Sequence, residues 1–144
     1  MRASKLRGTL LKQMPHWILP DLAWSFSRDI PDCLAEWEEA LVAYGDDVGI
    51  PAERDSLRLV LPVRALDVQY TDRIRGVNSE WQRTSQVVSV RASRLLSCGE
   101  ILYEVHKAVH AKLKDQDHSF FEGLKLLDGV FEQGVPAYTL LLGS

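Results

Sequence analysis

The sequence predicts an α+β fold in which two main helices cover one face of an antiparallel sheet of about five strands, in the order α-βββ-α-ββ. Apolar residues recur with the period of a helix in two stretches and with the period of a strand over 57–63, and four further short stretches are predicted to be strands. Helices and strands do not alternate regularly, as they would in a parallel α/β fold. The 144 residues are expected to form one domain, 1–144, with residues 1–26 as an N-terminal arm.

The first helix is predicted over about 29–44. Asp29 suits its N-cap, Pro31 fits the first turn because no hydrogen bond is lost there, and Gly45 is expected to end it. Acidic residues occupy much of its remaining surface. Its apolar side chains form one stripe at helical spacing, made of Ile30, Leu34, Trp37, Leu41 and Tyr44.

Three strands are expected to follow. Apolar residues alternate over 57–63, where Pro62 indicates an edge strand or a bulge. The second and third strands are predicted over 66–71 and 86–92, with a loop at 76–79 between them.

The second helix, predicted over 97–114, has the clearest local signal. Ser97 and Glu100 have the spacing of a capping box, in which the two side chains satisfy exposed amides at the helix start. Two further strands are expected over 120–127 and 137–142.

Composition and charge exclude several classes of protein. Apolar residues make up 46% and charged residues 26% of the chain, which excludes a disordered protein. No apolar run approaches the roughly 18 residues of a membrane span, and no secretory signal region is visible. Cys33 and Cys98 make no disulfide framework, so we expect a reduced, cytoplasmic protein without membrane association.

The net charge of −3 is distributed in blocks of alternating sign. Residues 1–20 hold four bases and no acid, and residues 21–55 hold ten acids against two bases. Residues 56–97 hold seven arginines against three acids, and residues 98–144 return to an acidic balance. Such blocks can neutralise one another within one fold, whereas a nucleic-acid-binding protein is usually basic overall, so nucleic acid is disfavoured as a partner.

Arginines on the predicted sheet are the first candidate binding residues. Arg58 and Arg64 fall on the less apolar face of their strand, and Arg91 is expected on the same kind of face. Arginine suits bidentate pairing with carboxylates. The acidic helix 29–44 is one partner for them, and an acidic protein is the other.

Tryptophans in the arm are the second candidates. Trp17 and Trp24 lie in an aromatic-rich stretch that either anchors the arm to the core or, where a ring is exposed, supplies an interface hot spot.

His106 and His110 are the third candidates. They lie one turn apart on the second predicted helix, so both imidazoles share a face and could bind a ligand or one metal ion. Two histidines are more often structural, and the sequence carries no nucleotide-binding, serine-hydrolase or zinc-protease motif. We assign no catalytic residue, cofactor or metal.

Four short strings, in this order, resemble an uncharacterised domain family of mushroom-forming fungi. They are Leu22-Ala23-Trp24-Ser25-Phe26, Ser56-Leu57-Arg58-Leu59, Gly99-Glu100-Ile101-Leu102-Tyr103-Glu104-Val105-His106 and Phe120-Phe121-Glu122-Gly123-Leu124. The resemblance covers about residues 22–125 and implies an α+β fold without implying an activity.

Together these features favour a small interaction protein that binds a protein partner through the arginine-bearing sheet face or the aromatic arm. The alternative is an enzyme or small-ligand-binding protein with a pocket at His106 and His110. A homodimer or other homo-oligomer stays open.

Overall fold

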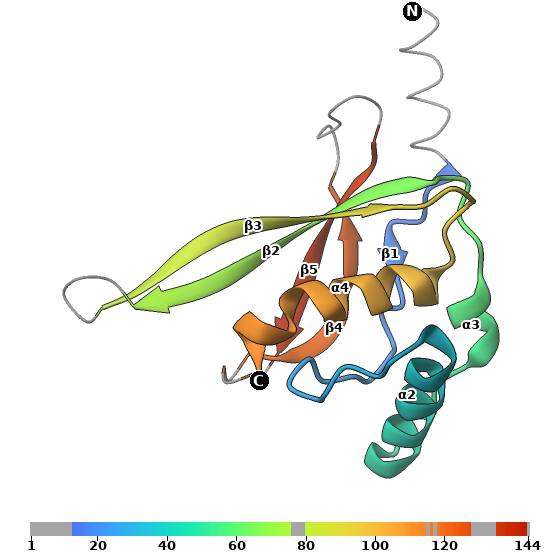
Figure 1. Ribbon diagram of the computed structural model, residues 1–144, viewed down its shortest axis with the longest axis horizontal. Coiled ribbons are helices and arrows are strands. Elements are labelled where there is room, and N and C mark those ends of the chain that lie inside the picture. Colours follow the sequence, from blue (N-terminus) through green and yellow to red (C-terminus); the bar gives the residue numbers. More distant parts are fainter. Residues whose placement is uncertain (1–12, 76–79, 115, 117, 128–134, 144) are drawn as a thin grey trace, which may run out of the picture.

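The protein has the predicted α+β class, and its described residues form five strands in one sheet and three helices (Figure 1). The computed structural model describes residues 13–75, 80–114, 116, 118–127 and 135–143, so the predicted loop at 76–79 and the first part of the arm lie outside it. The elements are β1 (Trp17–Ile18), α2 (Leu34–Val48), α3 (Arg54–Arg58), β2 (Ala65–Arg75), β3 (Trp81–Arg91), α4 (Cys98–Leu113), β4 (Phe120–Leu126) and β5 (Ala137–Gly143).

The sheet is mixed, and the expectation of a purely antiparallel sheet was wrong. The strand order is β1-β4-β5-β2-β3, and every neighbouring pair is antiparallel except β2 and β5. The reason is the helix between β3 and β4. Because α4 carries the chain back along the sheet, β4 runs in the direction of β3, and β5 then runs parallel to β2.

The predicted order of elements was wrong at its start, because the strand expected over 57–63 does not form. Its first residues belong to α3, which turns Leu57 into the core and leaves Leu59 57% exposed. The rest runs as irregular extended chain beside 96–98, with the amide of Leu61 donating to the carbonyl of Leu96. Instead, the N-terminal arm supplies the fifth strand, β1, which pairs with β4.

The helix expected over 97–114 is confirmed as α4. The Ser97 hydroxyl accepts a hydrogen bond from the backbone amide of Glu100 at 3.2 Å, and it donates to the Glu100 carboxylate at 3.1 Å. This cap fixes the start of the helix. Figure 1 shows α4 lying along one face of the sheet, with α2 and α3 on the same side.

The first helix, α2, starts and ends later than expected. Cys33 and not Asp29 holds the N-cap position, and Gly49 with φ of 78° ends the helix. Gly45 lies inside the helix, where the returning chain passes close to its backbone. A Cβ atom at this position would stand 2.6 Å from the carbonyl oxygen of Ile50, so a side chain is excluded by contact rather than by conformation.

The core lies between the sheet and the helices and includes the described part of the arm. On β2, Leu66, Val68 and Tyr70 are buried against the helices. From the arm, Ile18 and Phe26 are almost wholly buried in the same cluster. No helix in the described residues is long and apolar enough to cross a membrane.

The sheet divides into two branches. In the described residues, pairing between β2 and β5 ends at Gln69 and Thr139. Beyond that point β2 stays paired with β3, and β5 stays paired with β4 to the end of both strands. Figure 1 shows the long β2–β3 hairpin sweeping away from β4 and β5, so that the sheet forms a fork.

Candidate binding surfaces

His106 lies in the core and joins the arm to α4. The indole Nε1 of Trp24 donates to its Nδ1 at 2.8 Å, and its Nε2 lies 3.0 Å from the carbonyl oxygen of Arg28. Because an indole nitrogen can only donate, Nδ1 must be unprotonated, and Nε2 must carry the proton that it donates to Arg28. Both ring nitrogens of the neutral imidazole are therefore satisfied.

Burial keeps this imidazole neutral. The side chain of His106 is 0% exposed, and its desolvation lowers the pKa to about 4 although the bond to the Arg28 carbonyl opposes the shift. His110 stacks on the same ring with centroids 5.5 Å apart, and its Nδ1 lies 2.8 Å from the carbonyl oxygen of Phe26. The two histidines thus hold the arm in place.

This arrangement gives no support to a ligand site at the two histidines. Neither His106 nor His110 lines the hollows described below, and no set of three or more metal-ligating side chains gathers among the described residues.

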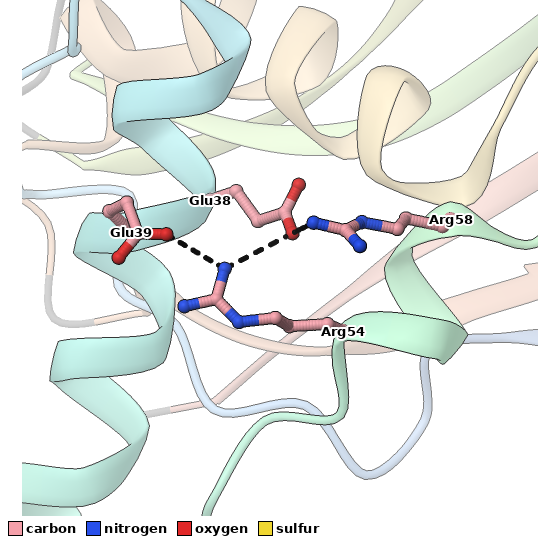
Figure 2. A network of polar contacts seen from close by, with 4 residues as sticks. All are labelled: Glu38, Glu39, Arg54 and Arg58. Atoms are coloured by element: carbon pink, nitrogen blue, oxygen red, sulfur yellow. Dashed lines mark hydrogen bonds and ion pairs between the residues drawn. The ribbon is translucent and has the colours of Figure 1, made fainter.

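Arg58 is engaged by the acidic helix that the sequence offered as its internal partner. Arg58 is the last residue of α3 and does not lie on the strand that was predicted over 57–63. Its Nη2 lies 3.0 Å from the Glu38 carboxylate of α2 (Figure 2). Arg54 contacts the same carboxylate and that of Glu39, at 3.4 and 2.8 Å. The network ties α3 to α2.

Arg64 and Arg91 lie at the same end of the β2–β3 hairpin. The Arg64 carbonyl accepts the amide of Ala92, which follows Arg91 directly. Both arginines are exposed, and Arg91 forms an ion pair with Asp67 of β2 at 3.0 Å. The structure brings these two predicted residues together and places Arg58 elsewhere.

The two tryptophans have different surroundings. Trp24 is 1% exposed and packs edge-on against Trp37 and Tyr44 of α2, so it anchors the arm and is closed to a partner. Trp17 is 42% exposed on β1, with the Lys125 ammonium 5.7 Å from its ring centroid. Of this pair, only Trp17 is accessible to another molecule.

The edge of β3 carries unpaired backbone groups. The amide of Asp67 on β2 donates to the Pro136 carbonyl beside β5, so odd-numbered residues of β2 face β5 and even-numbered ones face β3. Leu66 is paired with Val90, and every later even-numbered residue of β2 is likewise paired with an even-numbered residue of β3. The odd-numbered residues of β3 over 83–91 therefore direct their N–H and C=O groups outward. Within the described residues, β3 pairs with β2 only.

The same odd-numbered residues place their side chains on the face of the sheet away from the helices. All five are exposed, and they form a stripe with an arginine at each end: Arg83, Ser85, Val87, Ser89 and Arg91. We call this the β3 stripe. Arg83 was not among the predicted site residues, because the predicted strand began at 86. Continuing the two-residue alternation back from Arg91 would have found it.

A separate hollow of about 680 Å³ lies between the end of α2 and the start of β4. The arm forms one wall with residues 20–24, and Glu122 adds a carboxylate. Three large hydrophobic side chains in its lining are exposed to solvent, namely Val48, Ile50 and Phe120.

No family model, curated protein or solved structure matches this chain. The resemblance to the fungal domain family stays a prediction.

Proposed function

We propose that this protein is a binding module that takes an extended, acidic segment of a partner protein as an additional strand along β3. The β3 stripe carries the proposal, because one strand presents free backbone groups and an arginine at each end on the same residues. Strand addition draws its affinity from backbone hydrogen bonds and its specificity from alternate side chains.

The arginines select the partner. In the antiparallel pairing of two copies of the β3 stripe, centred on Val87, Arg83 of one copy would lie opposite Arg91 of the other. Directly opposed like charges are destabilising in a sheet. A partner strand with acidic residues at these two positions would instead form an ion pair at each end, so the stripe favours an acidic partner over a second copy.

The centre of the stripe is compatible with a neighbouring strand. Val87 is 56% exposed, and a partner's apolar side chain placed opposite would cover it. Ser85 and Ser89 are small enough to let another backbone approach. Exposed edge strands are normally blunted, and charged side chains such as these arginines also restrain pairing with the wrong strand.

The two thiols support action in a reducing compartment. Cys33 is exposed and Cys98 is buried, and both are free. Proteins of oxidising compartments usually pair their cysteines. We therefore propose the cytoplasm as the site of the interaction.

A proline scan of the edge tests the proposal. The probe is a labelled nine-residue peptide of alternating valine and threonine with a glutamate at each end, and binding is measured by fluorescence anisotropy. Val87→Pro removes an outward-facing amide that does not pair with β2, so the hairpin should survive while binding weakens at least about tenfold. Val87→Ala keeps the amide and serves as the matched control.

A second set of measurements tests whether binding depends on charge. Arg91→Glu should weaken binding of the acidic peptide, and a peptide with lysine in place of each glutamate should not bind the native protein. Circular dichroism and thermal melts confirm that each variant is folded. Equal affinity of Val87→Pro and Val87→Ala, or equal affinity of both peptides for the native protein, would overturn the proposal.

A further inference from the structure

We propose that the hollow between the end of α2 and the start of β4 is a docking site for a basic, amphipathic helix of a partner protein. The hollow has a volume of about 680 Å³. A smaller one of about 180 Å³ adjoins it, and Pro20, Asp21 and Leu22 line both. The residues that form the described walls of the larger hollow all lie more than two positions from any gap in the described chain.

The accessible walls of this hollow are mostly apolar. Val48 and Ile50 are exposed at and just after the end of α2, and Phe120 is exposed at the start of β4. Tyr44 is half-buried and lies one turn before Val48 on α2. Exposed hydrophobic side chains gathered in this way mark interaction sites. Because they are exposed, an occupant that covers them must extend beyond the hollow, as a macromolecule does and an enclosed small ligand does not.

The charge around the hollow is negative. Asp21 and Glu122 line it, Glu53 lines the smaller hollow, and all three side chains are exposed. No lysine, arginine or histidine is among the described residues that line either hollow. One base is close, because the guanidinium of Arg28 lies 5.2 Å from the ring centroid of Tyr44. The described surroundings are therefore acidic on balance and favour a cationic occupant.

The end of α2 is a second feature that favours a positive charge. The C-terminus of a helix is the negative end of its dipole, where basic side chains are stabilising and acidic ones are not. Asp46 and Asp47 nevertheless lie in the last turn of α2, which holds no base. They directly precede Val48 in the wall of the hollow. A lysine or arginine of a partner would offset the charge of both acids and of the helix end.

The backbone around the hollow excludes a strand as its occupant. The arm pairs with β4 at both ends of the hollow, through Ile18 with Leu124 and through Ser25 with Phe120. An added strand would therefore find no free run of backbone groups along this part of β4. An occupant must bind through its side chains, as an amphipathic helix does when its apolar face enters a groove.

This inference does not rest on the proposed function, because no residue of the β3 stripe is among the described residues that line the hollow. The two sites also select opposite charges, since the stripe offers arginines and the hollow offers carboxylates. The lysine peptide used as a control for the stripe is rich in valine and threonine, which favour an extended chain over a helix, so we do not expect it to bind at the hollow. Failure of one proposal leaves the other standing.

The test is a titration of the full chain with a labelled peptide, followed by fluorescence anisotropy. The peptide consists of twelve lysines and leucines, with the leucines at helical spacing so that they share one face. A second peptide has glutamate in place of each lysine and keeps the apolar face. A third has serine in place of each leucine and keeps the charge. We expect only the first peptide to bind, because the site requires both properties.

Two substitutions separate loss of binding from loss of folding. Asp47→Lys should weaken binding at least about tenfold, while the melting temperature stays the same or rises because a lysine suits the end of a helix. Ile50→Ser should weaken binding at least about fivefold, because it removes an apolar contact. Glu36→Lys makes the same change of charge in the first turn of α2, and Val87→Ser removes an exposed apolar side chain from β3. These two variants are the matched controls and should bind as the native protein does.

Several results would overturn the proposal. They are the absence of saturable binding of the first peptide, equal affinity for the glutamate peptide, and equal affinity of Asp47→Lys and Glu36→Lys. Residues 1–12 of this chain hold four bases and no acid and are the other candidate occupant. A double variant with Lys5→Glu and Arg7→Glu tests for it. If this variant binds the peptide and the native protein does not, the chain's own segment fills the hollow and the proposal of a partner is wrong.

Discussion

Acidification should destabilise the protein through His106, by an amount that the structure allows us to work out. The imidazole has an ordinary pKa of 6.5, and burial lowers it to about 4 in the folded state. In the unfolded chain the ring gains a proton as the pH falls through 6.5, while the folded protein resists protonation down to about 4. The stabilisation is therefore fully present above pH 6.5 and is lost as the pH falls from 6.5 to 4.

The size of the effect follows from the same two values. Each pKa unit corresponds to about 1.4 kcal/mol, so the folded state should lose about 3 kcal/mol over this range. That is a large fraction of the roughly 5–15 kcal/mol that stabilises an ordinary domain. The loss has a structural cause, because protonated Nδ1 can no longer accept the hydrogen bond from Trp24.

Urea unfolding at a series of pH values, followed by tryptophan fluorescence, measures this loss. The glutamine of His106→Gln cannot titrate in this range. The carboxylates are the same in the variant and the native protein, so subtracting one free energy of unfolding from the other removes their contribution to the pH dependence. The difference should shrink by about 3 kcal/mol between pH 6.5 and pH 4. His110→Gln, one turn along α4, leaves the imidazole of His106 in place. After the same subtraction, the free energy of unfolding of this variant should still show most of the loss between pH 6.5 and pH 4. A difference that does not vary with pH would refute the assignment of a buried neutral imidazole.

Two further predictions concern the helices. Gly45→Ala should lower the free energy of unfolding by about 1–3 kcal/mol, because its methyl group would meet the Ile50 carbonyl at 2.6 Å; an unchanged urea midpoint would show that the chain after α2 moves freely away. Cys33 is exposed, whereas burial raises the pKa of the Cys98 thiol to about 11. Iodoacetamide near neutral pH should therefore add a single label to the folded protein, detected by intact mass, and a second label before unfolding would contradict the packing of Cys98.

The elements that the sequence predicts well are those whose signals are local. Ser97 and Glu100 lie three residues apart, and the cap that they form depends on nothing distant. The paired strands β2 and β3 likewise alternate along their own length. By contrast, β1 has only two residues, too few for any period, and its place in the sheet depends on β4, more than a hundred residues later.

The erroneous strand over 57–63 shows how a regular pattern can mislead. Its alternating apolar residues look half-buried, but Leu57 and Leu61 enter the core while Leu59 between them faces solvent. One turn of helix at Arg54–Arg58 breaks the phase, and Pro62 cannot donate to a ladder.

The candidate site was predicted in part for the same reason. Exposure of Arg91 follows from alternation along β3, whereas Arg64 is exposed although the strand predicted to carry it does not form. The role of His106 does not, because its two hydrogen-bond partners are 82 and 78 positions away in the chain. A pair of histidines one turn apart looks alike in sequence whether it faces a cavity or a tryptophan.

The two edges of the sheet are unlike, and this bears on stoichiometry. One edge is the two-residue strand β1, and the other is the eleven-residue β3. A sheet with two long edges can add strands at both and grow into a fibre. Here a strand that docks on β3 has no equivalent landing place on the opposite edge of the described sheet. Assembly by strand addition should therefore stop at one partner segment per chain, as a closed one-to-one complex.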